Sequence, residues 1–260
     1  MTMADEKKLE EIAEKLEKIK KEAGEGAVGT DGLPHSPEKT APDMSSLKLL
    51  PSEAGKCRLL LVRHGESLGN AARTFLGHTD LDLSERGYEQ ARRTAQLLKS
   101  VDIDKIYASD LKRAFSTGCE IGKATGLPVE PDRKLRELFV GDWEGLAVSE
   151  LETSHAENFD LWRNSFFTFT PPGGESVAHL RERIYERIAE IARENMGKTV
   201  VLAFHAAAIR SFWSKITAQT GAEFNPDVPF PYNASVSVLY FDGENFMPGE
   251  FSHMVHLIDI

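Results

Sequence analysis

The fold of this chain is decided by Leu59-Leu60-Leu61-Val62-Arg63-His64-Gly65-Glu66, an apolar run that leads directly into a charged turn. An apolar run of this length, bounded by polar residues and glycine, is typical of a buried strand. Open α/β folds bind their ligands at the carboxyl edge of the sheet. The stretch therefore predicts a strand over 58–63 that places an arginine and a histidine at this edge.

The residues at the end of this strand suit a phosphate ligand. Arg63 carries a planar fork of donors that matches phosphate oxygens, and its charge does not depend on pH in the ordinary range. A neutral ring nitrogen of His64 can attack phosphorus, and Gly65 lets the backbone approach a ligand closely. Taken alone, Arg-His-Gly is also compatible with a plain turn at the end of a strand.

Strand-like and helix-like segments alternate along the rest of the chain, which is typical of a sheet covered by helices on both faces. We expect a three-layer α/β fold with a mostly parallel sheet. Further strands are predicted over 104–108, 199–204, 234–241 and about 246–252, and helices over 84–99, 111–125, 176–195 and 206–219. Ser84 is predicted to cap its helix, and Asp242-Gly243 predicts an antiparallel hairpin at one edge.

Residues 142–175 interrupt this alternation and are predicted to form an irregular inserted segment. The segment is aromatic and ends at Pro171-Pro172-Gly173-Gly174, and its aromatic residues are Phe159, Trp162, Phe166, Phe167 and Phe169. Such a segment is compatible with a lid over a pocket. For most of these rings we favour the alternative, packing in the core, with one or two rings facing a ligand.

The N-terminal part of the chain differs in composition from the rest. Residues 1–23 are rich in charge and carry an apolar stripe at helical spacing, which predicts a helical extension; the stripe is Leu9, Ile12, Leu16 and Ile19. Residues 24–56 predict a flexible linker, and 57–260 the catalytic domain. The stripe is compatible with pairing between chains in a homo-oligomer, although we favour a solvated helix or one docked on its own domain.

Charge and composition narrow the classes of partner. The chain has 260 residues and a formal net charge of −10, which argues against a nucleic-acid partner, because a phosphate backbone requires a basic face. The sequence has no apolar run of membrane-spanning length and no secretory signal, so a cytoplasmic location and no membrane partner are expected. Cys57 and Cys119 lie outside any metal-ligand spacing and are expected to be buried free thiols.

The remaining motifs, taken in order, resemble those of the histidine phosphatase superfamily, the phosphoglycerate-mutase-like enzymes. The resemblance covers roughly residues 57–258. It is carried by Arg63-His64-Gly65-Glu66-Ser67 with Asn70, by Phe204-His205, and by the stretches 77–87, 109–117, 137–145, 172–176 and 233–236. Within the superfamily the sequence is more similar to the phosphatase branch.

The resemblance implies an enzyme that transfers a phosphoryl group to a histidine. It makes His64 the nucleophile of a phosphohistidine intermediate. It makes Glu137 the acid that protonates the leaving alcohol and then activates water, which requires that the pKa of Glu137 is raised. The residues implied to bind and neutralise the phosphoryl group are Arg63, Arg113, His205, Asn70 and, through its backbone N–H, Ala206. Taken singly, Arg113 is also compatible with a surface charge, and Glu137 with an ion pair to Arg136.

Two departures from the family pattern bear on the activity. Ala206-Ala207 stand where the family usually has glycines, and their methyl groups would tighten the pocket. Residues 140–150 contain no Lys or Arg, whereas a mutase needs extra cationic groups near its pocket. We therefore expect a metal-independent phosphomonoesterase for a small phosphorylated metabolite. The alternatives are a phosphoglycerate mutase or related phosphomutase, and a non-catalytic protein that binds a phosphorylated ligand.

No metal and no other cofactor is expected. His64 and His205 together suggest zinc, but the neighbouring arginines would repel a cation and no third ligand is apparent. The remaining histidines are expected to be surface or core residues, and they are His78, His155, His179, His253 and His256. The last two are predicted on opposite faces of a strand end.

Overall fold

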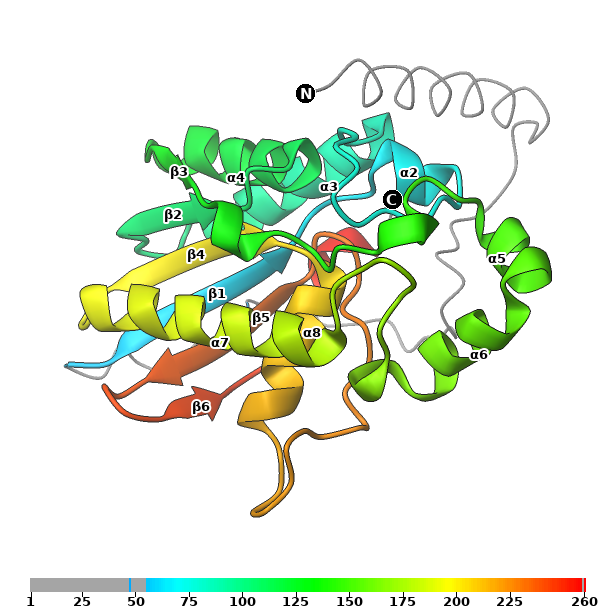
Figure 1. Ribbon diagram of the computed structural model, residues 1–260. Helices are drawn as coiled ribbons and strands as arrows, with labels where there is room; N and C mark the ends of the chain where they lie inside the picture. Colours follow the sequence, from blue (N-terminus) through cyan, green and yellow to red (C-terminus); the bar gives the residue numbers. More distant parts are fainter. Residues whose placement is uncertain (1–46, 48–54, 259) are drawn as a thin grey trace.

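The computed structural model of this protein describes residues 47, 55–258 and 260. Within these residues the strands are β1 (Cys57–Arg63), β2 (Lys105–Ala108), β3 (Val129–Pro131), β4 (Thr199–Phe204), β5 (Val236–Phe241) and β6 (Phe246–Pro248). They form one six-stranded sheet in the order β3-β2-β4-β1-β5-β6 (Figure 1). The chain crosses from β1 to β2 and returns to β4, so β1 and β4 are neighbours in the middle of the sheet.

The pairing of the strands brings two histidines to one edge. β4 runs parallel to β1 and to β2, β2 runs parallel to β3, and β5 runs antiparallel to β1 and to β6. Arg63 in β1 stands opposite Phe204 in β4. The residues that follow, His64 and His205, therefore leave neighbouring strands at the same carboxyl edge, where open α/β sheets bind ligands.

Helices cover both faces of the sheet, as the alternating pattern predicts. The principal helices are α3 (Glu85–Leu98), α4 (Lys112–Thr125), α7 (Val177–Glu194) and α8 (Ala206–Ile216). Figure 1 shows α3 and α4 over one face and α7 and α8 over the other. The buried side chains accordingly form two main clusters, one on each side of the sheet. Ser84 caps α3 as predicted, because its hydroxyl accepts the N–H of Gly87.

The predicted fold class is confirmed, while several element ends differ from the prediction. β5 begins at Val236 rather than at 234, because Ala234 has a positive φ of 55° in the turn before it. α8 ends at Ile216 rather than 219, and β6 ends at Pro248 rather than about 252. The edge strand β3 lies outside the prediction, since three residues are too few to show an apolar alternation.

The prediction of an irregular segment over 142–175 is wrong. Most of the segment is helical: its elements are η2 (Gly141–Trp143), α5 (Val148–Ser154), α6 (Ala156–Asn164) and η3 (Phe166–Thr168). The favoured packing of its aromatic rings is confirmed, because Phe159, Phe166, Phe167 and Phe169 are buried in the larger core cluster. Trp162 packs partly buried against the same cluster. The role of this segment as a lid stays a prediction.

Two expectations near the ends of elements are corrected. His253 and His256 do not lie on opposite faces of a strand end: their rings stack at 5.9 Å with an angle of 6° between planes. The reason is that the chain turns there into η4 (Val255–Leu257) instead of continuing as a strand. Cys57 is buried as expected, whereas Cys119 on α4 is only partly buried.

The N-terminal predictions fall mostly outside the described residues. This applies to the charged helix over 1–23 and to the linker over 24–56, of which the structure describes Leu47, Gly55 and Lys56. Leu47 is buried in the smaller core cluster together with Leu60 and Val62. Within the described part of the chain, no helix is both long enough and apolar enough to cross a bilayer.

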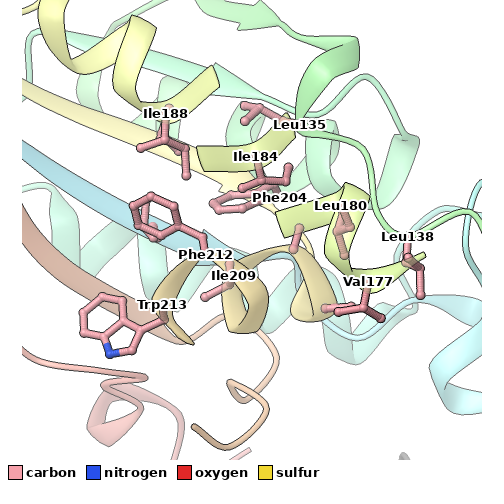
Figure 2. Packing of buried hydrophobic residues seen from close by; sticks show 14 of the residues in the cluster. Leu135, Leu138, Val177, Leu180, Ile184, Ile188, Phe204, Ile209, Phe212 and Trp213 are labelled. Carbon is pink, nitrogen blue, oxygen red and sulfur yellow. The ribbon is translucent and has the colours of Figure 1, made fainter. Parts of the chain in front are cut away.

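The larger core cluster fixes α7 and α8 on the sheet. Figure 2 shows Ile184 and Ile188 of α7 close to Phe204 of β4 and Phe212 of α8. All four side chains are fully buried. Because close-packed interiors do not collapse easily around a void, truncation of a side chain at this position creates a cavity.

We expect Ile184→Ala to lower the free energy of unfolding by about 2–5 kcal/mol, through lost burial and the cavity left behind. The matched control is Leu161→Ala on α6, where the side chain is 47% exposed. The control substitution is expected to lower the free energy of unfolding by less than about 0.5 kcal/mol. Urea unfolding followed by circular dichroism measures both, and similar losses for the two variants would contradict the packing described.

Candidate active site

The backbone at the carboxyl end of β1 holds His64 in place. Its N–H donates to the carbonyl of Phe204, and its own carbonyl accepts from the N–H of Ala234 and from the side-chain amide of Asn233. The ring is buried at 4% exposure. His64 is therefore fixed between β4 and the turn that precedes β5.

Hydrogen bonding determines which ring nitrogen of His64 is available. Nδ1 lies 2.6 Å from the carbonyl oxygen of Gly65, an acceptor that can only be matched by an N–H. The proton is thereby assigned to Nδ1, and the lone pair to Nε2. Burial, then the charges of Arg113 and Arg63, hold the pKa of His64 well below its usual value. The ring is thus a neutral imidazole with a free Nε2, which is the form that acts as a nucleophile.

His205 stands beside His64 at the end of β4. The two ring centroids are 5.3 Å apart in an edge-to-face arrangement. Nε2 of His205 lies 2.8 Å from the hydroxyl oxygen of Ser109, which follows β2. Its pKa is also held well below the usual value, by burial first and then by the charge of Arg113. The structure thus brings both predicted histidines to one point of the sheet edge.

Gly65 packs closely against the start of α3. A Cβ at Gly65 would collide with the backbone of Gly87, and a Cβ at Gly87 would collide with the carbonyl of Glu66. The two glycines therefore allow the turn after His64 to pack directly on the first turn of α3. The N–H of Gly65 donates to the hydroxyl of Thr117 on α4, at 3.1 Å. The glycine serves close backbone packing, and its expected role in the approach to a ligand stays a prediction.

Two arginines are buried beside the histidines. Arg63 is 3% exposed and donates from Nη1 to the carbonyl of Pro231 at 2.6 Å. Arg113, in the first turn of α4, is 1% exposed and donates to the carbonyls of Thr79 and Gly77 at 3.0 and 2.8 Å. The alternative interpretation of Arg113 as a surface charge is therefore wrong. Its pKa is lowered by burial, although the nearby carboxylates, Glu137 first, oppose the shift.

Glu137 joins this cluster through the N-terminus of α8. Its carboxylate accepts the N–H groups of Ala207 and Ala208, at 3.0 and 3.1 Å, and that of Leu138 at 2.9 Å. The alternative ion pair with Arg136 does not form, because Arg136 donates to Asp110. Burial raises the pKa of Glu137, and the three N–H donors oppose that rise only in part. The direction agrees with the requirement for a catalytic acid.

The predicted substrate-binding residues border the same site. Asn70 and Ser67 form a capping box at the start of α2 (Leu68–Ala71). The Oδ1 atom of Asn70 accepts hydrogen bonds from Ser67 and Asn233. Its amide NH₂ group is the part left to donate. Ala206 begins α8, and an N–H at this position has no acceptor within its own helix. Ala207 is buried in the larger core cluster, whereas Ala206 is partly exposed; the effect of the Ala206 methyl group on a pocket stays a prediction.

Several residues that support this site were missed by the sequence prediction. His78 was expected to be a surface or core residue, yet its Nε2 lies 3.0 Å from the carbonyl oxygen of Glu137. Arg183 on α7 donates to the same carbonyl and pairs with Glu175. Glu144 accepts the N–H groups of the loop that contains His78. His78 and Glu144 lie inside the motifs that carry the resemblance and Arg183 lies outside them, but a motif does not show which neighbour each side chain contacts.

The donor set gives no indication of a metal. Within the described residues, no three His, Cys, Asp or Glu side chains are grouped so that they could hold an ion. The two histidines face buried guanidinium groups, whose positive charge disfavours a second cation. The arrangement instead suits an anion with several oxygens, for which arginine forks are the usual protein partner.

Comparison with known proteins agrees with this chemistry. A family model described as histidine phosphatase superfamily (branch 1) matches residues 59–250.

The chain belongs to the histidine phosphatase superfamily.

Relatives within the family include named phosphatases. Phosphoserine phosphatase 1 of Hydrogenobacter thermophilus is 34% identical over 186 residues, or 71% of this chain and 87% of that protein. Phosphoglycerate mutase-like protein 4 of Arabidopsis thaliana is 36% identical over 203 residues, or 75% and 86%. A solved structure of a mycobacterial glucosyl-3-phosphoglycerate phosphatase in complex with VO3 matches with a TM-score of 0.69 and 29% identity, covering 75% of this chain and 99% of that one. The predicted class, a phosphoric monoester hydrolase, is confirmed by these matches.

We expect His64 to remain neutral at pH 6, protonated on Nδ1 only. The physical reason is that its lowered pKa keeps it from binding a proton as the pH falls through 6.5, the usual value for histidine. The unfolded chain does bind that proton, so the free energy of unfolding falls as the pH drops below this value. Nitrogen-15 NMR of the labelled imidazoles, with His64→Gln for assignment, measures the tautomer. A ring protonated on both nitrogens at pH 6 would contradict the expectation.

Proposed function

We propose that this protein hydrolyses phosphate monoesters of small metabolites through a phosphohistidine formed on Nε2 of His64. One observation carries the proposal: the hydrogen bond from Nδ1 to the Gly65 carbonyl leaves Nε2 of a neutral ring free, and the charges of two buried arginines act on that ring. A covalent intermediate splits one difficult displacement into two easier ones.

In the first step, the Nε2 lone pair attacks phosphorus and the bond from phosphorus to the ester oxygen breaks. Arg63 and Arg113 neutralise the equatorial oxygens, with His205 and the amide of Asn70 as further donors. Glu137 gives its proton to the leaving alcohol. In the second step Glu137 removes a proton from water, the water oxygen bonds to phosphorus, and the phosphorus–nitrogen bond breaks. Inorganic phosphate leaves, and both His64 and Glu137 return to their starting states.

The contacts of Glu137 distinguish its two oxygens. Oε1 accepts two N–H groups, from Leu138 and Ala208, while Oε2 accepts one, from Ala207. A carboxyl oxygen has two lone-pair directions. Oε2 can therefore carry a proton and keep its hydrogen bond, whereas a proton on Oε1 would displace a donor. We assign the transferred proton to Oε2.

A phosphomutase is the second candidate, because a mutase-like protein is among the relatives. A mutase must keep its phosphoryl group from water and return it to a bound intermediate. Residues 140–150 next to Glu137 supply no Lys or Arg for that purpose. Incubation with 3-phosphoglycerate separates the candidates, since a hydrolase releases inorganic phosphate and a mutase forms a phosphorylated isomer without releasing it.

Location and assembly stay part of the proposal. The free thiols Cys57 and Cys119 support a reducing compartment such as the cytoplasm. The apolar stripe of the N-terminal segment is compatible with a homo-oligomer. Light scattering of the full chain, which measures the molar mass in solution, tests this.

His64→Ala is expected to abolish turnover of a phosphate ester while the far-UV circular dichroism stays native, because no other side chain can supply the nucleophile. Wild type mixed with radiolabelled substrate and quenched in alkali should retain label on His64, since phosphohistidine survives base better than acid. The control His155→Ala, at the end of α5, should keep normal turnover. Clear activity in the His64 variant would refute the covalent role.

Activity is expected to survive EDTA and to be inhibited by vanadate. The buried arginines supply the charge neutralisation for which other phosphatases use metal ions. Vanadate adopts the geometry of the transferring phosphoryl group, and such analogues bind more tightly than substrates. Initial rates after dialysis against EDTA, with and without added zinc or magnesium, provide the measurement. Loss on chelation with recovery on adding metal would show that the site assignment is wrong.

A further inference from the structure

We propose that Glu144 is a positioning residue for Arg113, acting through the loop over 77–79. The inference rests on the proposed function and concerns how its phosphate clamp is held. Glu144 is 7% exposed, and it follows Trp143, which is fully buried. A carboxylate at such a place must be compensated by hydrogen bonds or by charge, and the structure shows where that compensation comes from.

The carboxylate of Glu144 accepts hydrogen bonds from all three residues of the loop over 77–79. Oε1 accepts the N–H of His78 at 2.6 Å, and Oε2 accepts the N–H groups of Gly77 and Thr79 at 3.2 and 2.9 Å. The hydroxyl of Thr79 also donates to Oε2, at 2.5 Å. Hydrogen bonds to a charged acceptor are about twice as strong as neutral ones. Four of them onto one carboxylate fix the conformation of this loop.

The opposite side of the same loop holds Arg113. Nη2 donates to the carbonyl of Gly77 at 2.8 Å, and Nη1 donates to the carbonyl of Thr79 at 3.0 Å. The carbonyl of Gly77 and the N–H of His78 belong to one peptide group. That single peptide therefore bridges the carboxylate and the guanidinium. Its dipole is aligned between a negative and a positive charge, so each hydrogen bond polarises the other.

The charge of Glu144 also acts on Arg113 directly. The negative charge of this carboxylate supports the cationic form of the buried guanidinium, second to that of Glu137. The loop continues to Asp80, whose carboxylate accepts the N–H of Lys112, the residue before Arg113. Arg113 is thus tied to this loop through both its side chain and the start of its helix.

Glycine is required at position 77 for this arrangement. A Cβ there would collide with an Oε atom of Glu144 and with the carbonyl of Leu138. The close approach of the loop to Glu144 therefore depends on a residue without a side chain. A solvated acidic residue would place no such demand on its neighbour.

Glu144→Gln tests the inference. Glutamine has nearly the same shape, but it has one acceptor oxygen and an NH₂ group that would face N–H donors. The loop and the guanidinium should shift together. Binding of vanadate by calorimetry and kcat/KM for p-nitrophenyl phosphate are measured in Glu144→Gln, in Arg113→Lys and in the double variant. Glu157→Gln, an exposed carboxylate on α6, is the matched control.

We expect Glu144→Gln to weaken vanadate binding about tenfold in the wild-type background, a change of about 1.4 kcal/mol. In the Arg113→Lys background the same substitution should change binding by less than about twofold, because residues that act through each other are not additive. Glu157→Gln should leave binding unchanged in both. Thermal unfolding of each variant reports stability separately.

The outcomes separate the two proposals. If wild type neither hydrolyses esters nor binds vanadate, the proposed function is wrong, and the inference that rests on it is wrong as well. If wild type binds vanadate and Glu144→Gln binds it equally well, only the inference fails. An equal loss in both backgrounds also overturns it, since Glu144 would then affect vanadate binding independently of Arg113. Should Glu144→Gln not fold, Thr79→Val replaces it and must show a loss of binding that disappears with Arg113→Lys.

Discussion

Burial of the Arg113 guanidinium is the constraint on which the rest of the site depends. A cation taken out of water costs several kcal/mol unless it is matched by acceptors and by opposite charge. Here the acceptors are two carbonyls of one loop, and the opposite charge comes first from Glu137 and then from Glu144. Such compensation is only partial, because no carboxylate forms an ion pair with Arg113 within the described residues. In the proposed function, a bound phosphate is the group that completes it.

A similar balance between burial and compensating groups determines the pKa of Glu137. Glu137 lies at the N-terminus of α8, where N–H groups and the helix dipole stabilise a negative charge. By itself that position would keep the carboxyl ionised and useless as an acid at neutral pH. Burial acts in the other direction and is the larger effect, so the pKa is raised. The negative charge of an arriving phosphate would raise it further, which links protonation of the acid to occupation of the site.

The sequence indicates where three of the proposed site residues come together, because each of the three stands where a buried strand ends or a helix begins. His64, His205 and Arg113 fall at such positions, and strand pairing brings them together. What it does not predict is contact between loops. The hydrogen bonds of Glu144 join residues 65 to 67 positions apart in the chain, and no local periodicity reports them. The helices within 142–175 were missed for a related reason: they are short, and their rings pack on a core that only the folded chain provides.

In the proposed mechanism, the nucleophile His64 and the two arginines that bind the phosphoryl group cannot be tuned independently. Burial of the ring is the main cause of the lowered pKa of His64, and the charges of Arg113 and Arg63, which we propose bind the phosphoryl oxygens, lower it further. A more exposed pair of arginines would bind phosphate less well and would leave more of the imidazole protonated near neutrality. A more buried pair would need further carbonyl acceptors from the loops that also hold Glu137. In the proposed mechanism, the arrangement at the sheet edge therefore couples substrate affinity to the protonation state of the attacking nitrogen of His64.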